Sequence, residues 1–258
     1  MNILVPTDFS NSSLNALQYA FALAEKIESA ITILYVGEKD GVADKLKKLT
    51  KESPIKLRTI FKSGRAAKTI INYANQSETD LIVMGTKGAS GMKKLVLGSN
   101  TVNVLEKTSI PVLVVPEQAE YKSLRMNDNR NNIVLASDFG VTANEDALDL
   151  VKQIATLFDA NEIRLLGVRP KNTKLNMLAK VERSREDQYF GKDLTVTRKT
   201  VYSDNILHGI NYYLGLKDDV AFVAMISRKE KEFLQKRLTS EMAFHSQLPL
   251  LILRDTIA

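Results

Sequence analysis

Glycine and hydroxyl residues gather in one stretch of the first half of this 258-residue chain. Gly85 and Gly88 are followed, after nine intervening residues, by Gly98 and Ser99 at the start of an expected helix. Glycine lets the backbone approach a phosphate closely and adopt the turns that aim several N–H groups at it. A helix start adds unpaired N–H groups and the positive end of the helix dipole. The spacing therefore predicts a phosphate cradle, to which the hydroxyls of Ser99 and Thr101 could add donors.

Other glycine motifs do not fit this stretch. It lacks the Gly-Lys-Ser/Thr sequence of a P-loop, and it does not follow a first strand as the dinucleotide fingerprint does. The alternative is a surface loop whose glycines serve only turns, and any single glycine here favours that simpler interpretation. The whole constellation, placed after a buried strand, favours the cradle.

The cradle needs a scaffold, and the first half alternates strand and helix patterns. Apolar runs and helical spacing predict strands at 3–7, 31–36, 55–62, 81–84 and 112–115, and helices at about 10–27, 42–51, 66–76 and 99–107. Strands that are apolar on both faces and separated by helices indicate a parallel sheet covered on both sides. Ligands bind such sheets beyond the carboxyl ends of the strands, which is where Gly85 begins.

The chain also repeats itself, with three matches in the same order. These are Asn2–Phe9 with Asn132–Phe139, Ile71–Tyr73 with Ile210–Tyr212, and Ile110–Val115 with Leu248–Leu253. We therefore expect two tandem α/β domains, at 1–116 and 131–258, joined by a polar linker at 117–130. Each domain would be a doubly wound, five-stranded parallel sheet flanked by helices, with right-handed crossovers.

Together with the glycine pattern, the opening Val5-Pro6-Thr7-Asp8 and the closing Pro111–Val115 resemble the universal stress protein family. The resemblance covers nearly all of residues 1–116 and, more weakly, 131–255. It implies a Rossmann-like sheet of strand order 3-2-1-4-5. It also implies an adenine nucleotide as cofactor, namely ATP, or ADP or AMP in its place, together with Mg.

By the same resemblance, Asp8 and the backbone near Val36 would contact the adenine and ribose, and the glycine stretch would hold the phosphates. The implied cofactor-binding residues are Pro6, Thr7, Asp8, Val36, Met84, Gly85, Gly88, Gly98, Ser99, Asn100 and Thr101. An Asp after a first strand often only caps the next helix, and for Asp8 alone that would be the simpler interpretation. The glycine stretch nearby favours ligand contact.

The second half lacks this cradle. Lys236 and Arg237 stand where Gly98 and Ser99 align, and residues 225–239 contain no glycine. Within that stretch Glu230, Lys231, Phe233, Leu234 and Arg237 suit a continuous helix. We expect no ATP site of the first type there, with Asp138 serving as a helix cap. His208 and His245 fall in expected helices without metal-ligand spacing, so no metal site is expected.

Composition narrows the class of protein further. The net charge is +6, but Lys and Arg are dispersed among nearly as many acids, which argues against nucleic acid as a partner. The chain has no cysteine, so disulfides and thiolate metal sites are excluded. No apolar run approaches the roughly 20 residues that span a bilayer, and no secretory signal pattern opens the chain. We expect a cytoplasmic protein that does not enter membranes.

The leading functional hypothesis is an ATP-binding stress-response regulatory protein whose second domain is degenerate. Two alternatives are a slow ATPase, for which no water-positioning residue is evident, and a nucleotide-independent scaffold or chaperone-like protein. Each half ends in an apolar edge strand, so we expect the halves to pair in a pseudo-twofold arrangement. A further homodimer is neither required nor excluded, and the protein partner is not identified by the sequence.

Overall fold

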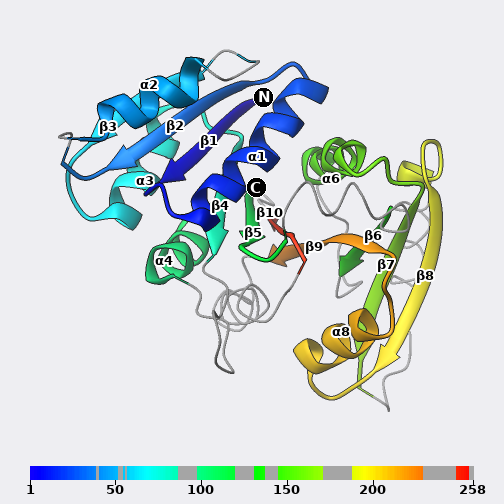
Figure 1. Ribbon diagram of the computed structural model, residues 1–258. Helices are drawn as coiled ribbons and strands as arrows, with labels where there is room; N and C mark the ends of the chain where they lie inside the picture. The colour runs from blue at the N-terminus through cyan, green and yellow to red at the C-terminus, as the bar shows by residue number, and fades with distance from the viewer. Residues whose placement is uncertain are drawn as a thin grey trace. The chain divides into compact units, whose positions relative to one another are not determined.

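The computed structural model describes residues 1–38, 41–51, 55, 57–86, 98–119, 131–136, 145–170, 188–228 and 248–255. These residues form two compact α/β units, 1–119 in the first and 131–255 in the second (Figure 1). In this part of the chain no helix is long and apolar enough to cross a membrane. The predictions for Gly88, Asp138, Lys236, Arg237 and His245 lie outside the described residues.

The first unit is a parallel sheet with the strand order β3-β2-β1-β4-β5, which confirms the predicted topology. Its elements are β1 (Asn2–Thr7), α1 (Asn11–Lys26), β2 (Ala30–Val36), α2 (Ala43–Lys51), β3 (Leu57–Lys62), α3 (Ala66–Gln76), β4 (Leu81–Thr86), α4 (Ser99–Lys107) and β5 (Val112–Pro116). Strands β1, β4 and β5 are almost entirely buried, as strands covered on both faces must be.

Helices cover both faces of this sheet. The apolar stripe of α1, which includes Ala16, Leu17, Ala20 and Leu23, is buried against β1, β4 and β5. Helices α3 and α4 pack against each other, and right-handed crossovers place them on the opposite face, where α3 contacts β2 and α4 contacts β4. Both α3 and α4 begin at the carboxyl edge of the sheet.

Two predicted boundaries were wrong by two residues. Strand β4 continues through Gly85 and Thr86, which pair with Val115 and Pro116 of β5, so the glycine stretch begins inside the sheet. Strand β3 begins at Leu57, the first residue that pairs with β2. Residue types within a strand do not show where it starts or stops, because its ends depend on backbone pairing with a neighbouring strand that is distant in sequence.

The second unit repeats this topology with the order β8-β7-β6-β9-β10. Its elements are β6 (Asn132–Ala136), α6 (Glu145–Leu157), β7 (Glu162–Arg169), β8 (Thr195–Tyr202), α8 (Ile206–Gly215), β9 (Val220–Arg228) and β10 (Leu250–Asp255). A hydrogen bond from Val223 N to Pro249 O repeats that from Ile82 N to Pro111 O in the first unit, both at 3.0 Å. The repeat seen in the sequence is therefore a repeat of folded units.

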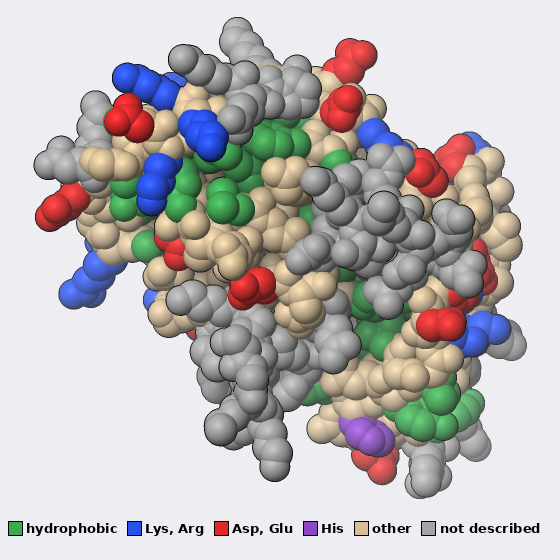
Figure 2. Space-filling view, viewed as in Figure 1, with side chains coloured by type: hydrophobic (Ala, Val, Ile, Leu, Met, Phe, Trp, Pro, Cys, Tyr) green, Lys and Arg blue, Asp and Glu red, His purple; other side chains and the backbone are tan. Residues whose placement is uncertain are grey.

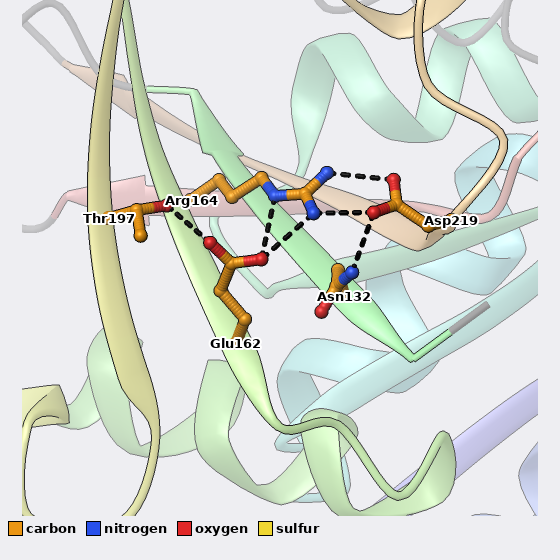
Figure 3. A network of polar contacts seen from close by, with 5 residues as sticks. All are labelled: Asn132, Glu162, Arg164, Thr197 and Asp219. Atoms are coloured by element: carbon orange, nitrogen blue, oxygen red, sulfur yellow. Dashed lines mark hydrogen bonds and ion pairs between the residues drawn. The ribbon is translucent and has the colours of Figure 1, made fainter. Parts of the chain in front are cut away.

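A polar network joins the amino ends of the strands in the second unit (Figure 3). The Arg164 guanidinium donates two hydrogen bonds to Asp219, at 2.8 and 2.5 Å, and its Nε donates to Glu162 at 2.9 Å. Thr197 donates to Glu162, and Asn132 donates to Asp219. The network thus links β6, β7, β8 and the residue before β9, at the edge opposite to the one where ligands bind such sheets.

Figure 2 shows where charged and hydrophobic side chains lie on one face of the molecule. On the face shown, basic and acidic side chains of the described residues are interspersed. Hydrophobic side chains are visible around α8, and the exposed ones in that region are Tyr202, Ile206, Tyr212 and Leu216. The interspersed charges agree with the dispersed pattern in the sequence.

Candidate functional site at the carboxyl edge of the first sheet

The turn between β1 and α1 is held by short polar side chains. Buried Thr7 shares a hydrogen bond of 3.0 Å with Ser13, and its Oγ1 accepts one from the backbone of Phe9. Ser10 is the N-cap of α1, and its hydroxyl accepts a hydrogen bond from the amide of Ser13. Asp8 accepts from the amide of Ser10 at 3.0 Å and from its hydroxyl at 2.5 Å. The helix start is thereby fixed beside the exposed Asp8 carboxylate.

The Asp8 carboxylate is ionised at neutral pH. Its partial burial would raise the pKa, but the hydrogen bonds from the Ser10 hydroxyl and backbone outweigh that effect and lower the pKa below its usual range. Both of these hydrogen bonds are made by Oδ1. Asp8 therefore supports the capping residue without being the cap, and Oδ2 takes part in neither bond.

Gly85 allows α1 to approach the end of β4. A Cβ atom added at Gly85 would lie 2.2 Å from the carbonyl oxygen of Ser12 and 2.8 Å from the amide of Ser13. The Gly85 carbonyl also accepts a hydrogen bond of 3.2 Å from the buried Thr101 hydroxyl. Gly85 and Thr101 thus bring the β1–α1 turn, the end of β4 and the start of α4 together.

Gly98 has different surroundings. It is the N-cap residue of α4 and provides no side-chain hydrogen bond to the helix, whose first turn contains no acidic residue. Among the described residues, a Cβ atom added at Gly98 would meet nothing within 4 Å. The first backbone hydrogen bond of the helix runs from Val102 N to Gly98 O. The amides of Ser99, Asn100 and Thr101 precede that bond and form the positive end of α4.

The remaining predicted site residues differ in how exposed they are. Ser99 and Asn100 are exposed in the first turn of α4, and Val36 is half-buried at the carboxyl end of β2. Pro6 and Met84 are buried in β1 and β4. The side chains of Pro6 and Met84 therefore belong to the floor of the site, while Ser99, Asn100 and Asp8 are accessible.

An aromatic cluster at the same edge was missed in the sequence. Phe9, next to Asp8, has a left-handed backbone with a φ of 61°, which is strained for an aromatic residue. Its ring centroid lies 5.8 Å from that of Tyr35, and the Lys45 ammonium lies 5.6 Å from the Phe9 centroid. No local pattern marks a left-handed phenylalanine, so only the fold could reveal it.

The sequence analysis also missed two cations near α4. Arg65 is the N-cap residue of α3, Lys68 lies in the first turn of that helix, and both line a groove together with Asn100 of α4. They come from a helix that the sequence analysis used only as scaffold, so nothing in the glycine motif pointed to them.

Comparisons with known proteins agree with this fold. A profile described as the universal stress protein family matches residues 1–45 and 37–116. Universal stress protein MJ0531 of Methanocaldococcus jannaschii is 30% identical over 136 residues, which cover 44% of this chain and 80% of that protein. Universal stress protein MJ0577 of the same organism is 31% identical over 150 residues, covering 44% and 93%. A crystal structure of a universal stress protein from Archaeoglobus fulgidus covers 98% of both chains at 20% identity, with a TM-score of 0.71.

Proposed function

Because this chain belongs to the universal stress protein family, we propose that it is a stress-response regulatory protein that binds ATP in its first unit. The second unit carries no equivalent glycine stretch in its sequence and serves as a degenerate partner domain. Occupancy of the first unit then alters the affinity for a protein partner. The protein acts in the cytoplasm.

One observation carries the proposal, namely the open position at Gly98 beside the uncapped start of α4. Among the other helices with a described N-cap residue, Ser10 and Asn205 cap α1 and α8 by their side chains, whereas Arg65 makes no such hydrogen bond to α3. At Gly98 a ligand phosphate would supply the missing acceptor for the amides of α4. Glycine is suited to this position because a side chain would occupy the phosphate space.

The accessible residues fit the two ends of a nucleotide. The amides of Ser99, Asn100 and Thr101 would bind phosphate oxygens, and the Ser99 hydroxyl would donate a further hydrogen bond. The Thr101 hydroxyl instead supports the site by donating to Gly85. Asp8 would accept a ribose hydroxyl on Oδ2. Bound Mg²⁺ would neutralise part of the phosphate charge.

Calorimetric titration of the full chain with Mg-ATP tests the proposal, and mass spectrometry of small molecules released by denaturation identifies what copurifies. Gly98→Val should weaken ATP binding about 100-fold, because the isopropyl group would enter the phosphate space. The same change at Gly215 is the matched control, because a Cβ there also meets nothing within 4 Å. Gly215→Val should leave the affinity for ATP unchanged.

Two results would refute the proposal. One is the absence of binding heat with Mg-ATP and of any released nucleotide. The other is a Gly98→Val variant that binds ATP as tightly as the wild type.

A further inference from the structure

A groove between α3 and α4 adjoins the proposed phosphate site. Its volume is about 780 Å³, within the range of small-molecule sites. Two polar stripes at helical spacing line it, with Arg65, Lys68 and Asn72 on the α3 side and Asn100, Asn103 and Lys107 on α4. Because Asn100 lies in the first turn of α4, the groove opens next to the amides that would hold a phosphate.

The charged residues that line the groove are all positive. The lining contains three cations and no acidic residue, and the first turns of α3 and α4 contain none either. Lys107 donates a hydrogen bond of 3.2 Å to Asn103 and lies about 10 Å along α4 from Asn100. Arg65 and Lys68 are exposed and have no ion pair with any residue in the described part of the chain. They are the cations at the end of the groove nearest the cradle.

The second unit provides an internal comparison. The alignment of Ile71–Tyr73 with Ile210–Tyr212 places Asp204 and Leu207 at the positions of Arg65 and Lys68. The N-cap residue of α8 is Asn205, one position later in this alignment, and its side chain caps the helix, whereas Arg65 makes no such hydrogen bond to α3. Within this chain, both cations occur in the unit that has the glycine stretch, and neither occurs in the unit that lacks it.

We propose that Arg65 and Lys68 bind the terminal phosphates of the nucleotide and make the first unit selective for nucleoside triphosphates over monophosphates. This inference rests on the proposed function. The amides at the start of α4 attract any phosphate group, so they discriminate little between AMP and ATP. Two cations along the groove favour only the ligands whose phosphate chain extends beyond the first phosphate.

Calorimetric titrations with ATP, ADP and AMP test the selectivity in the wild type and in three single variants. Arg65→Gln and Lys68→Gln should each weaken ATP binding about fivefold, the upper end of what exposed ion pairs contribute, and change AMP binding less than twofold. Lys107→Gln is the matched control, because it removes the same charge from the far end of the groove. It should leave the ratio of ATP to AMP affinity unchanged. Thermal unfolding of each variant shows that the first unit remains folded.

The outcomes separate this inference from the proposed function. Equal affinity of the wild type for ATP and AMP would overturn the selectivity while leaving nucleotide binding intact. So would a loss of ATP affinity in Lys107→Gln as large as that in Arg65→Gln or Lys68→Gln. If no nucleotide binds, the proposed function fails, and inorganic tripolyphosphate then tests the groove alone. Tripolyphosphate binding that weakens in Arg65→Gln would support the groove as an anion site, whereas no binding would overturn it.

Discussion

Alanine substitutions at Gly85 and Gly98 separate the packing role of Gly85 from the proposed ligand-binding role of Gly98. The new methyl carbon at Gly85 would lie 2.2 Å from the Ser12 carbonyl oxygen, 2.3 Å from its carbonyl carbon and 2.8 Å from the Ser13 amide. All three contacts are far shorter than a normal carbon contact, and all three are made to backbone atoms. No side-chain rotation can relieve them, so either α1 or the end of β4 must move.

The expected cost follows from this geometry. Inserting a methyl group into a packed region typically costs 1–3 kcal/mol, and backbone obstacles favour the upper end, so we expect Gly85→Ala to destabilise the first unit by about 3 kcal/mol. For a unit of this size the midpoint of thermal unfolding should fall by roughly 10–15 °C. Gly98→Ala should cost at most about 1 kcal/mol, the penalty of alanine at an N-cap, because its methyl group meets open space.

Urea and thermal unfolding followed by far-ultraviolet circular dichroism measure both variants against the wild type. The expected order of stability is wild type, then Gly98→Ala, then Gly85→Ala. A Gly85→Ala variant as stable as Gly98→Ala would refute the close approach of α1 to β4. It would also show that the two glycines are not distinguished by packing.

Two further predictions concern the second unit. Arg164→Met should destabilise it by about 2 kcal/mol in urea unfolding, because the Arg164 side chain is only 9% exposed and balances the Glu162 and Asp219 carboxylates. Lys152→Met removes the pair with the 62% exposed Asp193 and should cost less than about 1 kcal/mol. Equal losses of stability in the two variants would contradict the expectation that the buried ion pair matters more. Hydrogen bonds from Arg164 lower the pKa of Asp219, and those from Arg164 and Thr197 outweigh burial and lower the pKa of Glu162. The stability that these lowered pKa values contribute is therefore full above about pH 5 and is lost as the pH falls through the folded-state pKa values. The difference in unfolding free energy between wild type and Arg164→Met should therefore narrow in acid. A constant difference from pH 7 to pH 3 would contradict this account.

Much of the architecture was available from the sequence. The spacing of hydrophobic residues differs between buried strands and amphipathic helices. The order of elements in the first unit, beginning with the strand at 3–7, could therefore be predicted from the sequence, and it was confirmed. The strand order came from the family resemblance, because local pattern says nothing about which strands pair. The repeat of Asn2–Phe9 at Asn132–Phe139 extended the same fold to the second half.

The candidate site was less fully determined by the sequence. The glycine spacing marked Gly85 and Gly98 as equivalent parts of one motif, but the structure gives them different surroundings. A Cβ at Gly85 would meet the backbone of α1, whereas a Cβ at Gly98 would meet no described residue within 4 Å. The Thr101 hydroxyl, predicted as a ligand donor, donates to the Gly85 carbonyl. These distinctions depend on elements that are distant in sequence.

By itself, then, the sequence determined the repeat, the kinds of element and the position of the glycine stretch after a buried strand, because each of these is a local pattern of residue types. Only the tertiary structure decided that Arg65 and Lys68 share a groove with Asn100, and that Arg164 joins Glu162 to Asp219. The physical reason is that side chains from different elements meet only when the sheet forms and its helices pack. No periodicity along the chain encodes those distances.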